Sequence, residues 1–67
     1  MFAEVALSIS TFQSFTYKIP PDLIHIAQIG CRVKVPLGNR LVHGVITAIN
    51  DVAVFKGEVK SISEMID

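Results

Sequence analysis

A catalytic nucleophile–base pair in this sequence would have to be drawn from His25, Cys31 and His43. A catalytic pair needs hydrogen-bond contact between nucleophile and base, and a third group that orients the base. Nothing in the local spacing points to such an arrangement. We therefore predict that this chain is not an enzyme, that Cys31 is a small core residue, and that the histidines lie at the surface or at strand edges.

Motifs that bind nucleotides or metals are also missing. The sequence has no G-x-x-x-x-G-K-[ST] loop, whose backbone N–H groups would surround phosphates. A single cysteine excludes a C-x-x-C pair, and no Cys/His quartet is present to bind zinc. We expect no catalytic residue, no metal and no cofactor in this chain.

Length and composition predict one small folded domain. The chain has 67 residues, of which 51% are apolar, so its composition is not that of a disordered protein. Glu4 stands where a secretion signal carries basic residues, and no apolar run approaches the ~18 residues of a membrane span. Together with the lone cysteine, these features indicate a cytoplasmic protein.

The net charge is zero, but the charges are unevenly placed. Six basic residues balance six acidic ones, yet residues 23–50 contain no acid and include Arg32, Lys34 and Arg40. Proteins that follow a duplex backbone are usually strongly basic, because their affinity comes from neutralised phosphates. The sequence therefore predicts a local basic surface and not a long phosphate-binding track.

Apolar and polar residues alternate in four segments, which predicts strands over 3–9, 15–19, 30–35 and 41–49. Short strands at about ten-residue spacing favour an all-β fold, either a small closed or partly open β-barrel of mostly antiparallel strands or a small sandwich. We expect these residues to be mostly buried: Val5, Leu7, Ile9, Tyr17, Val33, Val35, Val45, Ile46 and Ile62.

Three features of the pattern have more than one interpretation. Gly44 within the fourth strand indicates a bulge, a sharp bend or the close approach of another backbone. Residues 22–29 suit one helical turn or a loop packed on the core. Residues 58–66 fit either a helix or a strand, and 52–57 fit no element clearly.

Two blocks of sequence carry a resemblance to a known family. Residues 15–20 read F-T-Y-K-I-P, residues 30–38 read G-C-R-V-K-V-P-L-G, and G-V-I follows at 44–46. This resembles the N-terminus of PriA-type replication-restart helicases (primosomal protein N′), which runs T-F-D-Y-x-x-P, G-x-R-V-x-V-P-F-G and then G-x-V. The resemblance covers nearly the whole chain.

The resemblance implies a single DNA-end-binding β-barrel domain over 1–67, belonging to a longer helicase. In that family the module binds the 3′ end of the nascent leading strand at arrested replication forks, largely without regard to the base. The full-length proteins are ATP-dependent 3′–5′ DNA helicases of the primosome, which use ATP with Mg and bind zinc in domains outside this chain. Implied partners are forked or single-stranded DNA with a free 3′ end, single-stranded DNA-binding protein and other primosome proteins.

The resemblance also implies a site for the 3′-terminal nucleotide, formed by Phe15, Thr16, Gly38 and Lys60. Phe15 would lie against the base, although the alternation alone also allows a core position. Gly38 would let the ligand approach the backbone, and Lys60 would supply a cation. The expected DNA backbone contacts are Arg32, Lys34 and Arg40, although exposed strand charges have a simpler explanation as solvated residues.

Thr16 departs from the family pattern, in which an Asp accepts a hydrogen bond from the terminal sugar hydroxyl. A threonine hydroxyl can accept the same bond without charge assistance. From the sequence we therefore expect weak discrimination between 3′-hydroxyl and 3′-phosphate ends.

Two other binding functions fit parts of the pattern. A glycine followed by V-x-V, a turn and a G-V-I strand is also similar to small KOW-type barrels that bind RNA or ribosomal proteins. A barrel that binds only protein is the third alternative.

Overall fold

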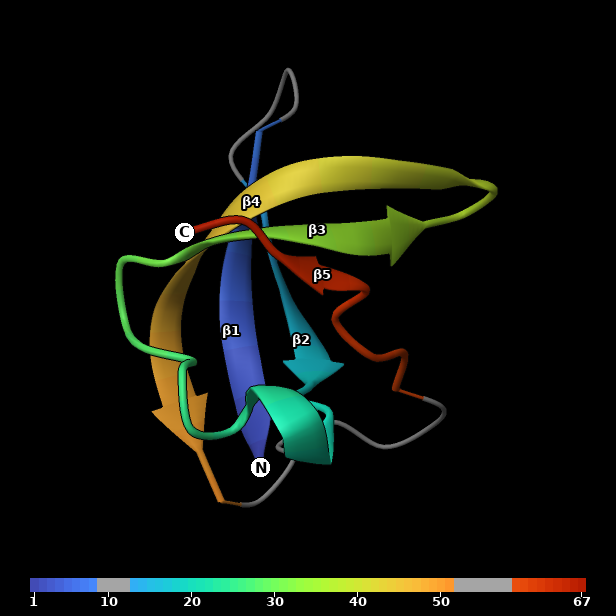
Figure 1. The fold of residues 1–67 in the computed structure, drawn as a ribbon. Helices are drawn as coiled ribbons and strands as arrows, with labels where there is room; N and C mark the ends of the chain where they lie inside the picture. Colours follow the sequence, from blue (N-terminus) through green and yellow to red (C-terminus); the bar gives the residue numbers. More distant parts are fainter. Residues whose placement is uncertain (9–12, 52–58) are drawn as a thin grey trace.

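The computed structural model describes residues 1–8, 13–51 and 59–67. These residues form one five-stranded antiparallel sheet in the order β2-β1-β4-β3-β5 (Figure 1). The all-β prediction is confirmed, and no described helix is long and apolar enough to cross a bilayer. The elements are β1 (Phe2–Leu7), β2 (Ser14–Lys18), the 3-10 helix η1 (Pro21–Leu23), β3 (Arg32–Leu37), β4 (Arg40–Asn50) and β5 (Glu64–Met65).

The sheet curls until its two edges meet beside Lys18. The backbone N–H of Lys18 donates to the carbonyl of Lys60 (2.9 Å), and that of Ile62 donates to the carbonyl of Lys18 (3.0 Å). Upstream of Lys18, the described residues pair β2 with β1 alone. The fold is therefore a partly open barrel, joined at one end of β2 and open along the rest of that strand.

The core follows the predicted alternation in three strands and departs from it at Val45. That side chain is 38% exposed. Neighbouring strand residues face opposite sides of a sheet, so Gly44 and Ile46 occupy the inner face of β4 and Val45 the outer face. Ile9 lies outside the described residues. The buried core consists of Ala3, Val5, Leu7, Tyr17, Ile19, Val33, Val35, Ile46 and Ile62.

Gly44 is required by the close approach of β1. A Cβ at this position would lie 2.5 Å from Val5 Cγ1 and 2.9 Å from the carbonyl oxygen of Ala6. The pairing of β1 with β4 also shifts between Glu4 and Val5, which is a bulge a few residues away. Of the explanations that the sequence left open, close backbone approach is the one that applies to Gly44 itself.

The two ambiguous segments also resolve. Within 22–29 the chain makes one short helical turn, and Leu23 and Ala27 pack against the core. Residues 59–67 contain the short strand β5, which pairs with β3, so the helical alternative for this segment is wrong. The third strand begins at Arg32, after a turn in which Gly30 has a positive φ of 97°.

Candidate nucleic-acid interface

A pocket of about 280 Å³ lies at the open edge of β2. Its volume is near the lower end of the roughly 300–1,000 Å³ typical of small-ligand sites. The four residues predicted to bind the terminal nucleotide come together here from three separate segments of the chain. The lining residues are Ser14, Phe15, Thr16, Tyr17, Pro36, Leu37, Gly38 and Lys60.

Phe15 belongs to both the pocket and the core. It is opposite Val5 in the β1·β2 pairing and therefore lies on the inner face of the sheet. It is half-buried, packs against the core cluster and lines the pocket. The two interpretations of Phe15 are thus compatible, since the aromatic ring meets apolar side chains and still borders the cavity.

Tyr17 joins the two walls of the pocket. Its hydroxyl donates a hydrogen bond to the backbone carbonyl of Pro36 (2.8 Å), which links β2 to the end of β3. Burial raises the pKa of the Tyr17 hydroxyl. Sequence reasoning placed Tyr17 in the core but missed its role in the pocket. The available signal was a tyrosine at an inward position, because a buried hydroxyl needs a hydrogen-bond partner.

Thr16 presents its backbone at this edge, whereas its side chain lies beside Glu4 of β1. Backbone groups alternate in direction along a strand, and those of Lys18 point away from β1 toward Lys60 and Ile62. Thr16 lies two residues earlier, so its N–H and C=O point toward the same open edge. Its hydroxyl donates a hydrogen bond to the carboxylate of Glu4. Sequence reasoning missed this contact, because it depends on the pairing register of β1 and β2.

Gly38 forms the turn between β3 and β4. Leu37 is opposite Arg40, which leaves Gly38 and Asn39 as a two-residue loop. Gly38 has a φ of 62°, whereas no described non-glycine residue has a positive φ, and this is the pattern of a type II′ turn. An added Cβ would meet nothing within 4 Å. The backbone conformation therefore explains this glycine, and the space beside it stays open on the pocket side.

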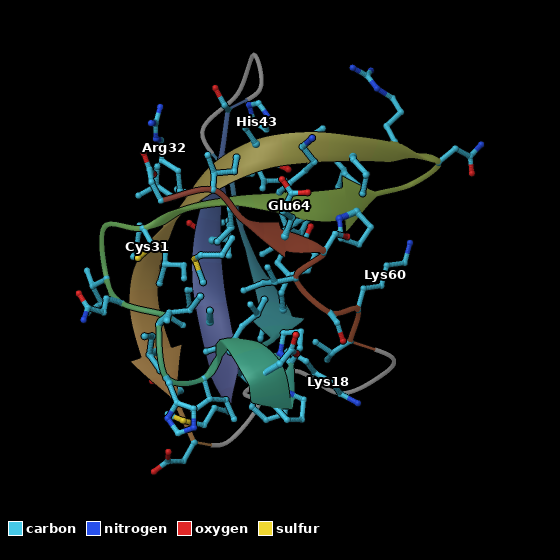
Figure 2. The ribbon with its side chains drawn as sticks, viewed as in Figure 1. Lys18, Cys31, Arg32, His43, Lys60 and Glu64 are labelled. Atoms are coloured by element: carbon cyan, nitrogen blue, oxygen red, sulfur yellow. The ribbon has the colours of Figure 1, made fainter. Side chains whose placement is uncertain are left out.

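Lys60 lines the pocket, and Lys18 directly follows the lining residue Tyr17. Figure 2 shows both lysines on the right-hand side of the molecule, and the backbone N–H of Lys18 donates to the carbonyl of Lys60. Both are exposed. Lys18 was missed by sequence reasoning, although its position on the polar face of β2, two residues from Thr16, was visible in the alternation.

The three predicted backbone-contact residues are placed differently from one another. Arg32 lies on the other side of the molecule from Lys60 (Figure 2) and forms an exposed ion pair with Asp67, with Nε–Oδ1 at 2.9 Å. This hydrogen bond from Arg32 lowers the pKa of Asp67. Lys34 is half-buried and opposite Glu64 of β5. Arg40 is exposed and follows the turn that contributes Gly38 to the pocket.

The candidate nucleophile and bases do not assemble into a site. Cys31 is half-buried, packs against the core, and its thiol contacts the carbonyl of Ile26 at 3.7 Å. His25 and His43 are exposed, and His43 lies apart from Cys31 in Figure 2. Cys31 is therefore a packing residue at the edge of the core.

Comparison with known proteins identifies the family of this domain. Residues 4–67 match the family profile of the 3′ DNA-binding domain (3′BD) of PriA. The chain belongs to this family. It is also 37% identical over 70 residues to the replication restart protein PriA of Bacillus subtilis (strain 168), an alignment that covers 98% of this chain and 9% of that protein. The resemblance seen in the sequence is confirmed, and the chain is a DNA-binding domain, not an enzyme, that corresponds to a small part of its relative.

Proposed function

We propose that this domain binds the free 3′ end of nascent leading-strand DNA at arrested replication forks, largely independently of the base. It would act as the recognition module of an ATP-dependent 3′–5′ helicase in replication restart. The observation that carries the proposal is the pocket at the open edge of β2, which gathers Phe15, Thr16, Gly38 and Lys60 in a member of a 3′ DNA-binding family. In the cytoplasm, the full-length protein would act with single-stranded DNA-binding protein and other primosome proteins.

The character of the lining supports binding without base selection. Phe15 offers an aromatic face, and every base can stack on such a face. Pro36 and Leu37 add apolar contacts, which do not distinguish one base edge from another. Lys60 lines the pocket and Lys18 follows the lining residue Tyr17; both are exposed, so both can meet phosphates of the incoming strand.

The closed end of the barrel supports recognition of an end over an internal nucleotide. The backbone of Lys18 donates to Lys60 and accepts from Ile62, and these two bonds join the sheet edges beside the pocket. A strand that continued past the bound nucleotide in both directions would meet this junction. A DNA strand that ends in the pocket needs only one route out of it, so a terminal nucleotide fits this geometry better than an internal one.

The proposal can be tested by fluorescence titration with two single-stranded DNAs of equal composition, one linear with a 3′-hydroxyl and one circular. The linear strand should bind more tightly to the wild-type domain. Phe15→Ala should weaken that binding by about 1–3 kcal/mol, the usual value of one base–aromatic stack. Ile29→Ala is the matched control, because Ile29 is an exposed apolar residue that does not line the pocket. Equal affinity of the wild-type domain for both strands would exclude end recognition.

A further inference from the structure

The arginine at the end of the β3–β4 hairpin, Arg40, has no acidic partner among the described residues. Arg32 forms an ion pair with Asp67, and this is the one ion pair within the part of the chain that the structure describes. Arg40 is exposed, and residues 23–50 of the sequence contain no Asp or Glu. Its guanidinium is therefore available to an anion that comes from outside the domain.

The pairing register places Arg40 on the pocket side of the hairpin. Arg40 of β4 is directly opposite Leu37 of β3. Residues directly opposite each other in an antiparallel pair carry their side chains on the same face. That face is the inner one, because Leu37 follows the buried Val33 and Val35 at alternate positions of β3. Leu37 lines the pocket, so Arg40 leaves the sheet on the face that borders the pocket, without itself lining it.

The turn that begins at Gly38 offers a bound strand a route out of the pocket. Figure 1 shows that this turn, between β3 and β4, projects beyond the other strands. Gly38 lines the pocket, and an added Cβ there would meet nothing within 4 Å, so the space beside the turn is unfilled. Where β2 ends, by contrast, the backbone of Lys18 is hydrogen-bonded to that of Lys60. A strand whose last nucleotide lies in the pocket therefore has an open path past the turn and past Arg40.

A strand that follows this path presents its phosphates to Arg40. The phosphates that link the terminal nucleotide to the preceding ones are the first anions outside the pocket. A guanidinium stays charged and forms two parallel hydrogen bonds with phosphate oxygens. Because phosphates are the same at every nucleotide, this contact adds affinity without selecting a base.

We propose that Arg40 binds a backbone phosphate just outside the pocket, so that the domain holds the 3′-terminal nucleotide together with the strand that leads to it past the β3–β4 turn. The inference rests on the proposed 3′-end binding and adds the direction in which the strand leaves. It assigns the backbone contact to the arginine on the inner face of the hairpin, and not to Arg32, whose charge is already paired.

The test titrates wild-type and Arg40→Gln domains with a ladder of single-stranded ligands that share one 3′-terminal nucleoside and grow by one nucleotide at the 5′ end. Wild-type affinity should rise at the length that brings a phosphate to Arg40. Arg40→Gln should lower the affinity about fivefold or more from that length onward and leave the shorter ligands unchanged, which also shows that the variant is folded. For the longest ligand, the slope of log affinity against log salt should be shallower by about 0.7, the value of one phosphate contact on a single strand.

Two controls separate this contact from general charge. A neutral methylphosphonate at the phosphate identified by the ladder should weaken binding to the wild-type domain and have no further effect on Arg40→Gln, because the phosphate and the arginine act as one pair. Gln28→Glu lowers the net charge by one, as Arg40→Gln does, at an exposed residue that does not line the pocket. It should leave the affinities for the whole ladder unchanged.

Failure of this inference can be distinguished from failure of the proposed function. If the wild-type domain prefers linear to circular DNA but Arg40→Gln binds every ligand as the wild type does, end recognition stands and the contact with Arg40 is overturned. An equal loss for the nucleoside alone, which has no phosphate, or an equal effect of Gln28→Glu would also overturn it. Equal affinity of the wild-type domain for linear and circular strands removes the proposed function itself.

Discussion

Strand β1 pairs with β4 on one side and with β2 on the other. The two pairings differ in how closely the strands approach and in whether the neighbouring strand has an open edge. Toward β4 the backbones approach so closely that Gly44 has no room for a Cβ beside Val5 and Ala6. Toward β2 the pairing is regular, but the far edge of β2 is open and borders the pocket that Thr16 lines. The β1·β4 contact thus has no free space at Gly44, whereas β2 keeps backbone N–H and C=O groups available at its open edge.

The difference shows how a domain this small can hold a binding site. The tight β1·β4 contact includes four of the buried core residues, Ala3, Val5, Leu7 and Ile46, and fixes the position of β1. β1 in turn places Glu4 opposite Thr16 of β2, within hydrogen-bond distance. The close packing and the pocket therefore lie on opposite sides of β1, and substitutions on the two sides should have separable effects on stability and on binding.

The largest loss of folding stability is expected from Gly44→Val, in the close contact between β1 and β4. The new side chain would overlap Val5 and a backbone oxygen of Ala6, and backbone cannot move aside as a flexible side chain can. We expect a loss of about 3 kcal/mol or more, a large part of the stability of a small domain. Urea denaturation followed by circular dichroism measures it.

Val45→Thr is the control for this substitution, because Val45 is the outward-facing neighbour of Gly44. It should change the free energy of unfolding by no more than about 0.5 kcal/mol. If Gly44→Val were as stable as Val45→Thr, β1 and β4 could not lie as close as described.

A smaller loss of folding stability is expected from Tyr17→Phe, because Tyr17 belongs to the core and also lines the pocket. The variant leaves the carbonyl of Pro36 without its donor, which should cost about 1 kcal/mol and weaken 3′-end binding, since the link between β2 and β3 is lost. The raised pKa gives a further check. Burial favours the neutral Tyr17 hydroxyl, so its stabilising contribution is fully present below the ordinary pKa of 10.0 and is lost as the pH rises through the raised pKa and the hydroxyl ionises.

Wild-type stability should therefore fall relative to Tyr17→Phe when urea denaturation is repeated above pH 10. If the difference in stability between wild type and Tyr17→Phe were the same at pH 7 and at pH 11, this hydroxyl could not be buried as described.

The smallest change in folding stability is expected from Asp67→Asn, which breaks an exposed ion pair with Arg32. Because the hydrogen bond from Arg32 lowers the pKa of Asp67, its contribution is present above the ordinary pKa of 3.8 and is lost as the pH falls through the lowered value. Thermal melts should show a slight difference from wild type at pH 7 and none at pH 2. If Asp67→Asn instead changes 3′-end affinity, the Arg32 side of the molecule contacts DNA as well.

Alternation predicted the strands and most of the core, because a half-buried strand repeats every two residues. It failed at Val45, where two adjacent branched residues were both assigned to the core although they must face opposite sides. It could not reveal the bond between Glu4 and Thr16, since pairing register depends on how two strands meet. The grouping of Phe15, Gly38 and Lys60 came from the family resemblance, because no local pattern connects residues so far apart in the chain.

The junction between Lys18 and residues 60–62 has a consequence for the order in which the domain becomes functional. The strand that carries Phe15 and Thr16 is made early, but Lys60 and the backbone bonds that close the barrel come from the last part of this sequence. Contacts between segments distant in sequence form late, because the chain must first bring its ends together. During synthesis, DNA-end binding should therefore begin only after Ile62 has left the ribosome, when the whole barrel can close.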